Sequence, residues 1–217
     1  MKERKKINRD ILFPTPVYFK RAKDFKKLNK YLFPRIKAWS KKDKSEIKTN
    51  AGGGWHSSTN MNLKKEYKPL TDELFAMQNE IYKDYGMQDT PALGNMWANI
   101  NYPGAYNQTH IHPNSQWSGV YYVKVPKNSG SLWVEDPRPG PNIMLPRRHK
   151  SLPKALWRMV LYPPQEGQII MFPAWLPHGV EMNESKEKGE EGWRVSVSFN
   201  FIQVRYTSCP DLENERS

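Results

Sequence analysis

Residues 193–201 read WRVSVSFNF, and this stretch decides the class of fold. Every second residue in it is polar: Arg194, Ser196, Ser198 and Asn200. Successive side chains leave opposite faces of an extended chain, so this alternation is typical of a half-buried β-strand. The stretch therefore predicts a strand over 193–205 with one apolar face and one polar face.

The segment before this stretch, back to about residue 93, has the same character. Short apolar runs lie between Pro, Gly and charged turns. They predict six more strands, at 94–102, 117–125, 130–135, 156–162, 167–172 and 177–182. No helical periodicity interrupts these runs, so they favour an all-β barrel or sandwich.

The amino-terminal part has a different pattern. Residues 11–19 contain two prolines and predict an edge strand. Apolar residues at three- and four-residue steps predict amphipathic helices over 23–39 and 63–85. Pro34 is the weak point of the first helix, and Gly86 suits the C-terminal stop of the second. We predict that both helices pack outside the β core.

The chain length fits one compact domain. Its 217 residues are enough for a sizeable core, and 37% hydrophobic and 12% aromatic residues are typical of a packed chain. We expect residues 1–92 to form the edge strand and helical buttress, 93–207 the catalytic β core, and 208–217 a polar tail. No apolar run approaches the ~20 residues that span a bilayer, and no signal-peptide stretch follows the basic amino terminus. We therefore expect a cytoplasmic protein without a membrane partner.

Cysteine content and charge narrow the function further. Cys209 is the only cysteine, which excludes an intramolecular disulfide and a thiolate metal cluster. Any metal must then be held by His, Asp or Glu. The net charge of +12 can attract polyanions such as nucleic acid, but charges scattered over a solvated surface are the better explanation.

Three of the five histidines have the spacing of a metal site. His110 and His112 lie in QTHIHPN, and on an extended backbone both side chains leave the same face. His178 lies in FPAWLPHGV, 178 − 112 = 66 residues later. In a facial triad on a double-stranded β-helix, the jelly-roll fold of cupins, two metal ligands lie close together in the sequence and a histidine follows after a long gap. We predict that these three histidines bind iron(II).

Three ligands on one face of iron leave the opposite positions open for a bidentate oxo-acid and for dioxygen. A carboxylate is the usual second ligand, and here His112 holds that position. Asp136, which precedes Pro137, is the alternative third ligand because it supplies a carboxylate. An Asx turn or a salt bridge to Arg138 is the other interpretation of Asp136.

Arg194 follows His178 by sixteen residues and lies among apolar residues. A buried arginine needs an anion, and a guanidinium group binds a carboxylate through two parallel hydrogen bonds. The distal carboxylate of 2-oxoglutarate meets this need. We predict that Arg194 binds this co-substrate, with added hydrogen bonds from Ser196 or Ser198.

Other residues have structural interpretations. His56 either lines the mouth of a pocket or makes a structural hydrogen bond, and His149 in a basic loop is expected to be solvated. The segment 183–192, rich in Glu and Lys, predicts a solvated hairpin tip. Four tryptophans are expected to fill the barrel: Trp117, Trp133, Trp157 and Trp175.

Several motifs together resemble the 2OG-Fe(II) oxygenase family found in bacteria and in phages of aquatic bacteria. They are HIHPNS at 110–115, SGVYYV at 118–123, GSL at 130–132, DPR at 136–138, FPAWLPHGV at 172–180 and RVSVSFN at 194–200. LFPTPVY at 12–18 and GGWHS at 53–57 resemble its amino-terminal motifs. The resemblance implies a double-stranded β-helix, Fe(II) and 2-oxoglutarate, with His110, His178 and Arg194 in the family's roles. It also implies a bacterial or phage-infected host cell.

The motif order is also similar to that of the prolyl hydroxylases, in which a tyrosine on the strand after the histidine pair contacts 2-oxoglutarate. By this likeness Tyr122 contacts the co-substrate. The expected activity is hydroxylation of a C–H bond by dioxygen. The expected substrate is a protein side chain, a nucleic acid or a metabolite. A homodimer is the expected assembly to test. Two alternatives remain: a three-His cupin-like dioxygenase without 2-oxoglutarate, and a non-catalytic phage or nucleic-acid-binding barrel.

Overall fold

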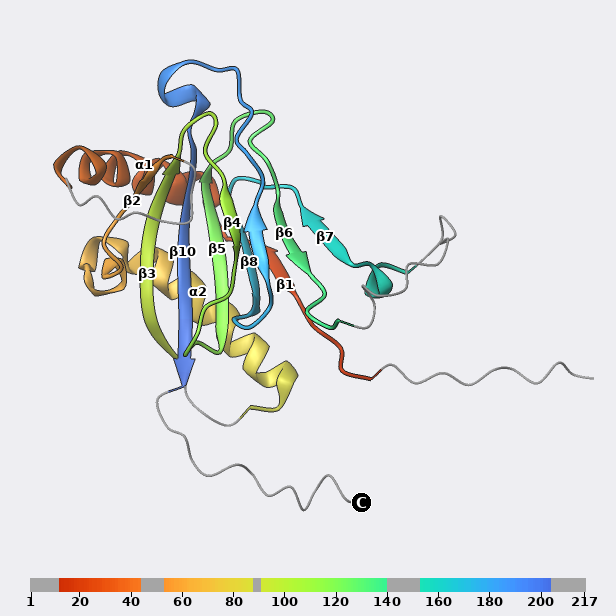
Figure 1. Cartoon of the computed structure of the whole chain (residues 1–217). Helices are drawn as coiled ribbons and strands as arrows, with labels where there is room; N and C mark the ends of the chain where they lie inside the picture. Colours follow the sequence, from red (N-terminus) through yellow and green to blue (C-terminus); the bar gives the residue numbers. More distant parts are fainter. Residues whose placement is uncertain (1–11, 44–52, 88–90, 140–152, 204–217) are drawn as a thin grey trace, which may run out of the picture.

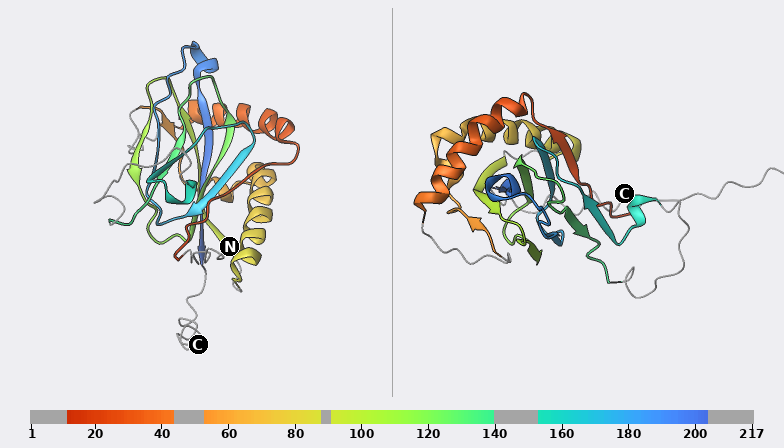
Figure 2. Two further views of the ribbon diagram at one scale, coloured as in Figure 1. Left: turned by 90° about the vertical axis from the view of Figure 1, so that its right-hand side faces the viewer. Right: turned by 90° about the horizontal axis from the view of Figure 1, so that it is seen from above.

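Two antiparallel β-sheets face each other, and two helices cover the outside of the larger sheet (Figure 1, Figure 2). This is a computed structural model, and it describes residues 12–43, 53–87, 91–139 and 153–203. Among these residues, no helix is long and apolar enough to cross a membrane.

The helical elements lie mostly in the amino-terminal part. They are α1 (Phe25–Lys42), η1 (Met61–Leu63), η2 (Lys65–Tyr67), α2 (Lys68–Tyr85), η3 (Lys154–Leu156) and η4 (Gly189–Gly192). The strands are β1 (Tyr18–Arg21), β2 (Trp55–His56), β3 (Pro91–Asn101), β4 (Asn107–His110), β5 (Trp117–Lys124), β6 (Leu132–Glu135), β7 (Met159–Tyr162), β8 (Gln168–Pro173), β9 (His178–Val180) and β10 (Arg194–Gln203).

The strands form a six-stranded major sheet and a four-stranded minor sheet. The major sheet has the order β1-β8-β5-β10-β3-β2, and the minor sheet has the order β4-β9-β6-β7. Neighbouring strands in each sheet are often far apart in sequence, and all the pairings are antiparallel. This arrangement is the one predicted for a double-stranded β-helix.

The larger apolar core lies between the helices and the outer face of the major sheet. Helix α1 contributes Leu28, Leu32 and Ile36, which recur at four-residue steps and so form one buried stripe. From the central strand β10, four residues enter this core: Val195, Val197, Phe199 and Phe201. The other face of β10 is therefore directed between the two sheets.

A smaller apolar core fills the space between the sheets. Its buried members are Tyr122, Leu132, Val134, Ile170, Phe172 and Leu176. The polar residues of β10 alternate with the residues of the larger core and line the same inter-sheet space. The inside of the barrel thus has apolar and polar regions, and the polar region holds the candidate site.

The seven strands predicted from the sequence are all present, with ends that shift by at most three residues. The edge strand predicted over 11–19 is present only in part, because β1 at one edge of the major sheet begins at Tyr18 and residues 12–17 are not in a strand. The sequence pattern missed two short strands, β2 and β4. Each pairs with a distant strand, so pairing and not local periodicity defines it.

Some expectations were wrong in detail. The second helix begins at Lys68 and not at 63, because Pro69 is tolerated in the first turn of a helix but not in its interior. Leu63 is 79% exposed, and Trp157 and Trp175 are about half exposed, so none of the three fills the core. Segment 183–192 is not merely a solvated tip, because the buried Asn183 donates hydrogen bonds to the carbonyls of Asn101 and Gly192.

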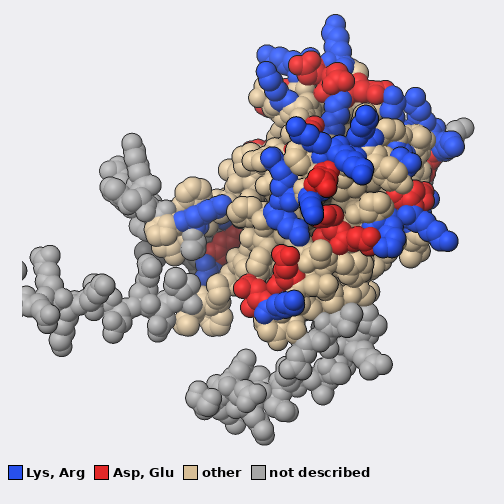
Figure 3. Space-filling model, turned by 180° about the vertical axis from the view of Figure 1, so that it is seen from behind, with Lys and Arg blue, Asp and Glu red and all other residues tan. Residues whose placement is uncertain are grey.

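Positive charge is spread over the side opposite the view of Figure 1. Lys and Arg side chains cover much of this side, and Asp and Glu side chains lie among them (Figure 3). Lys37 pairs with Glu190, and Lys124 pairs with Glu191 at 3.0 Å. This mixed surface is typical of a solvated face and does not single out a polyanion site.

Candidate metal centre and co-substrate pocket

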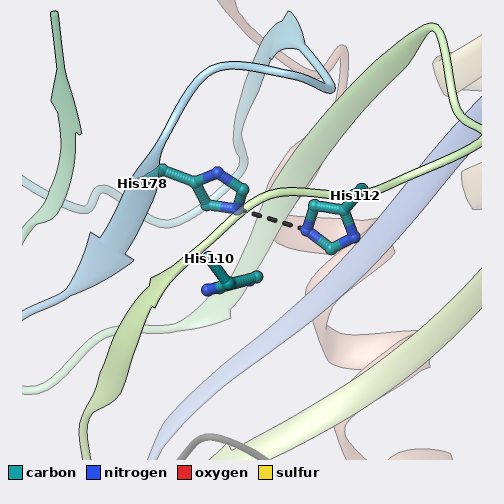
Figure 4. Close-up of side chains that lie close together, drawn as sticks. All are labelled: His110, His112 and His178. Atoms are coloured by element: carbon teal, nitrogen blue, oxygen red, sulfur yellow. Dashed lines mark hydrogen bonds between the residues drawn. The ribbon is translucent and has the colours of Figure 1, made fainter. Parts of the chain in front are cut away.

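Three histidine side chains converge between the sheets (Figure 4). His110 ends β4 and lies opposite His178, the first residue of β9, in the β4–β9 pair. His112 lies two residues beyond the strand, where its backbone N–H donates to the carbonyl of Ala174 at 2.9 Å. The potential ligand atoms of the three lie within 4.8 Å of one another. Within the described ranges, no other group of three His, Cys, Asp or Glu is close enough to share a metal ion.

A glycine makes room for this arrangement. A Cβ atom on Gly179 would lie 2.5 Å from the ring of Trp133 and 2.9 Å from the carbonyl oxygen of Asn107. Both distances are far below van der Waals contact, so only glycine allows β9 to lie this close to β4 and β6. The His-Gly pair in the sequence is thus the local reason why His178 reaches the other two histidines.

Hydrogen bonds fix which ring nitrogen of two histidines is free. His110 Nδ1 lies 2.8 Å from the carbonyl of Gln108, and His178 Nδ1 lies 2.9 Å from the carbonyl of Leu176. A carbonyl can only accept, so Nδ1 carries the proton in both rings and Nε2 keeps its lone pair. The Nε2 atoms of His112 and His178 are 3.2 Å apart (Figure 4). Two nitrogens that bind one metal at about 2.1 Å and a near-right angle are about 3 Å apart, so this spacing fits a shared ion.

His112 has a side-chain partner instead of a carbonyl. Its Nδ1 lies 3.4 Å from the Nδ2 atom of the buried Asn200. Ser118 Oγ donates to Asn200 Oδ1 at 2.6 Å, and Asn200 Nδ2 donates to Asn95 Oδ1 at 2.8 Å. If the amides of Asn200 and Asn95 were both turned by half, the Asn200 oxygen would lie beside His112, where it would accept a proton from Nδ1 and leave Nε2 free for a metal.

Burial keeps two of the imidazoles neutral. It lowers the pKa of His178 to about 3 and the pKa of His112 to about 4, and the proximity of the His110 ring lowers both further. A histidine must be deprotonated at one nitrogen to bind a metal, so these rings are ready to do so at neutral pH.

The histidines lie in a cavity of about 210 Å³ between the sheets. Arg194, 1% exposed, lines the same cavity. Its Nη1 donates to the carbonyls of Ser129 and Glu181, the latter at 3.1 Å. Its Nη2 is buried and has no hydrogen-bond partner among the described residues. A buried donor without a partner is costly, so the guanidinium group is suited to receive an anion.

The remaining predicted co-substrate residues line the same cavity. Ser196 lies opposite Tyr122 on β5, and Ser198 lies opposite Val120. Asn99 Nδ2 donates to Ser198 Oγ at 3.0 Å. Burial raises the pKa of Tyr122 to about 12, so its hydroxyl is protonated at neutral pH and can donate. Burial also lowers the pKa of Arg194 to about 10, which leaves this side chain charged.

The structure gives Asp136 a different partner. Its carboxylate accepts hydrogen bonds from Arg138 Nε at 2.9 Å and Nη2 at 2.7 Å, and from the backbone N–H of Arg138 at 3.1 Å. The hydrogen bond from the Arg138 side chain lowers the pKa of this carboxyl group. Asp136 thus makes both an Asx turn and a salt bridge, and it is not part of the histidine group.

The residues that line the cavity but were not assigned to it from the sequence include Trp97, Asn99, Asn101 and Asn107. Three of them alternate on β3 with the buried Met96, Ala98 and Ile100. This period-two pattern was the signal that could have placed them on the polar face. His56 also lines the cavity and makes the expected local hydrogen bond, so both interpretations of this residue hold.

The fold has close counterparts among solved structures. A prolyl-4-hydroxylase from Pseudomonas putida is similar over 87% of this chain and 93% of its own, at 11% identity and a TM-score of 0.60. A viral collagen prolyl hydroxylase from Paramecium Bursaria Chlorella virus-1, solved with 2OG, matches over 86% and 97%, at 15% identity and a TM-score of 0.54. HygX from Streptomyces hygroscopicus, solved with iron bound, matches over 94% and 90%, at 10% identity and a TM-score of 0.57. These matches confirm the predicted fold class.

The sequence comparison identifies the family. No curated protein sequence matches the chain. Residues 95–200 match the model of the family described as "Putative 2OG-Fe(II) oxygenase". This segment includes all three histidines and Arg194, and the match gives no support to a phage origin. Over residues 95–200, which include most of the β core, the chain belongs to the 2OG-Fe(II) oxygenase family, whose cofactors are Fe(II) and 2-oxoglutarate.

Proposed function

We propose that the chain is a hydroxylase in which His110, His112 and His178 hold iron(II) and Arg194 anchors 2-oxoglutarate. The observation that carries this proposal is the convergence of three imidazoles and one buried, partly unpartnered arginine in a single cavity. In the overall reaction a C–H bond, dioxygen and 2-oxoglutarate give a C–OH group, succinate and carbon dioxide.

The donor set fits iron(II). Neutral imidazoles are suitable ligands for this ion, and three of them on one side leave the other positions open. Bound iron(II) supplies the chemistry that couples dioxygen to the oxidation of 2-oxoglutarate. The protein's part is to hold the Nε2 atoms toward one point, through the carbonyls that bind Nδ1 of His110 and His178.

Arg194 and the hydroxyl groups account for binding of the co-substrate. Arg194 Nη2 can donate to the distal carboxylate of 2-oxoglutarate, while Nη1 is held by backbone carbonyls and so fixes the plane of the guanidinium group. The protonated hydroxyl of Tyr122 and the hydroxyls of Ser196 and Ser198 are further donors along the same wall. The positive charge of Arg194 thus selects a dianionic acid over a neutral one.

The test is an anaerobic titration followed by visible absorption. Iron(II) and then 2-oxoglutarate are added to the purified protein, to His178→Ala and to Arg194→Ala. Arg158→Ala is the matched control, because Arg158 pairs with Glu135 at 3.0 Å and does not line the cavity. We expect a weak charge-transfer band that requires both additions, is lost in His178→Ala, is weakened in Arg194→Ala and is unchanged in the control.

The other outcomes are equally clear. Bound iron without a band in the presence of 2-oxoglutarate would favour a dioxygenase that binds its substrate directly. Failure of the wild-type protein to bind iron would refute the proposal.

A further inference from the structure

One wall of the cavity has no role in holding iron or 2-oxoglutarate. It is formed by β2 and β3 and contains His56 and Trp97. The two rings stack with centroids 5.5 Å apart and an interplanar angle of 21°. Trp97 also lies 5.8 Å from the ring of His112. The wall therefore begins beside the proposed iron ligands and extends away from them.

His56 presents a hydrogen-bond acceptor at this wall. Its Nδ1 lies 2.6 Å from the carbonyl of Ser57 and so must carry the ring proton. Nε2 then keeps its lone pair, and no described residue donates to it. Burial lowers the pKa of His56, which favours this neutral form.

The chemistry of the cavity limits what the wall can receive. Among the described residues that line it, Arg194 is the only one with a charged side chain, and the proposed function assigns this charge to 2-oxoglutarate. No carboxylate is present there to bind a cation. Bound 2-oxoglutarate would occupy much of this cavity of about 210 Å³. Only a small group of the substrate can enter beside it.

We propose that the His56–Trp97 wall binds the reacting part of the substrate, a small, flat and neutral group with an N–H donor. The flat face of this group packs on Trp97, and its donor binds His56 Nε2. A carboxamide or a lactam ring has this chemistry. The inference rests on the proposed function, since it takes the three histidines as the point toward which the reacting C–H bond is directed.

The test uses two probes that differ in one hydrogen-bond donor. 2-Pyrrolidinone is a flat neutral ring with an N–H group, and N-methyl-2-pyrrolidinone has the same ring without that donor. Their dissociation constants are measured by ligand-observed NMR, with and without Fe(II) and 2-oxoglutarate under anaerobic conditions. Loss of one hydrogen bond should weaken binding roughly 2- to 12-fold, so the N–H probe should bind tighter by this factor.

Variants show whether the wall causes this preference. His56→Leu removes the acceptor and should bring the ratio of the two dissociation constants to about one. His56→Gln keeps an acceptor oxygen and should restore part of the ratio. Trp97→Leu should weaken both probes together. Circular dichroism and urea unfolding verify that each variant is folded.

Three results would overturn the inference: equal binding of the two probes to the wild type, a ratio unchanged in His56→Leu, or tighter binding of the cation pyrrolidinium. The failure of the proposed function is seen separately, as a missing charge-transfer band with iron(II) and 2-oxoglutarate. The ratio of the two probes' dissociation constants, measured by NMR in metal-free protein, tests the His56–Trp97 wall in either case. N-acetylglutamine amide and uridine then distinguish a peptide from a nucleoside as the source of the group, by which of them stimulates succinate release.

Discussion

Replacement of Asn200 by leucine should weaken iron binding through His112. Asn200 is 3% exposed, and its amide is held between Ser118 and Asn95 within reach of His112 Nδ1. With its oxygen toward His112, the amide accepts the Nδ1 proton and so leaves Nε2 free for iron. Leucine has a similar size but cannot accept a hydrogen bond, so this variant removes the selection of the ring tautomer.

The size of the effect follows from the geometry. Loss of a partner that orients a metal-bound histidine typically lowers metal affinity about 10- to 100-fold, or about 1.4 to 2.7 kcal/mol. The same change leaves the hydroxyl of Ser118 without its partner in a buried environment, which costs about 1 to 3 kcal/mol of folding stability. We therefore expect weaker iron binding and a lower midpoint of urea unfolding.

The assay is anaerobic competition for iron(II) with a chromophoric chelator, and it compares Asn200→Leu with Asn200→Asp. Aspartate has the shape of asparagine and keeps an acceptor, so its iron affinity should stay within a few-fold of wild type. Ser118→Ala releases one side of the amide and should give an intermediate loss. Wild-type affinity in Asn200→Leu, or an Asn200→Asp variant as weak as Asn200→Leu, would refute the reasoning.

Four further outcomes are expected. Arg194→Met should raise the Kd of 2-oxoglutarate at least about 30-fold, because an unpaired buried carboxylate costs about 2 kcal/mol or more. A titration of the charge-transfer band measures this Kd. The affinity for iron should change little. In EDTA, urea titrations should give the highest free energy of unfolding above pH 6.5 and a lower one as the pH drops toward 4, because the unfolded chain takes up protons that the buried His112 and His178 resist. The decrease should reach up to about 1.4 kcal/mol per pH unit for each buried imidazole. The His178→Ala variant should show a shallower slope. His112→Asp supplies the usual carboxylate ligand and should keep the iron and 2-oxoglutarate band, whereas His112→Ala should lose it. Asp136→Asn should leave iron affinity unchanged in the chelator assay, and a large loss would identify Asp136 as a ligand.

The local sequence was enough to predict the main elements. Alternation in residues 193–201 marked β10 and separated its core face from its cavity face, because side chains of an extended chain alternate by geometry alone. Three- and four-residue steps likewise marked α1 and most of α2. The histidine spacing and the buried Arg194 pointed to residues that share one cavity.

Other features depended on contacts between distant segments. Strands β2 and β4 exist through pairing with β3 and β9, and neither has a periodic pattern of its own. The exposure of Trp175, which was expected to fill the barrel, was likewise decided by its neighbours in space.

The sequence by itself determined which residues lie on the same face of a strand or helix, because the backbone repeat sets the direction of each side chain. Only the tertiary structure decided which histidine nitrogen is free, that Asn200 lies beside His112, and that His56 stacks on Trp97. These contacts join residues as far apart as 88 positions. They follow from how the two sheets and the amino-terminal segment pack, and no local pattern encodes that packing.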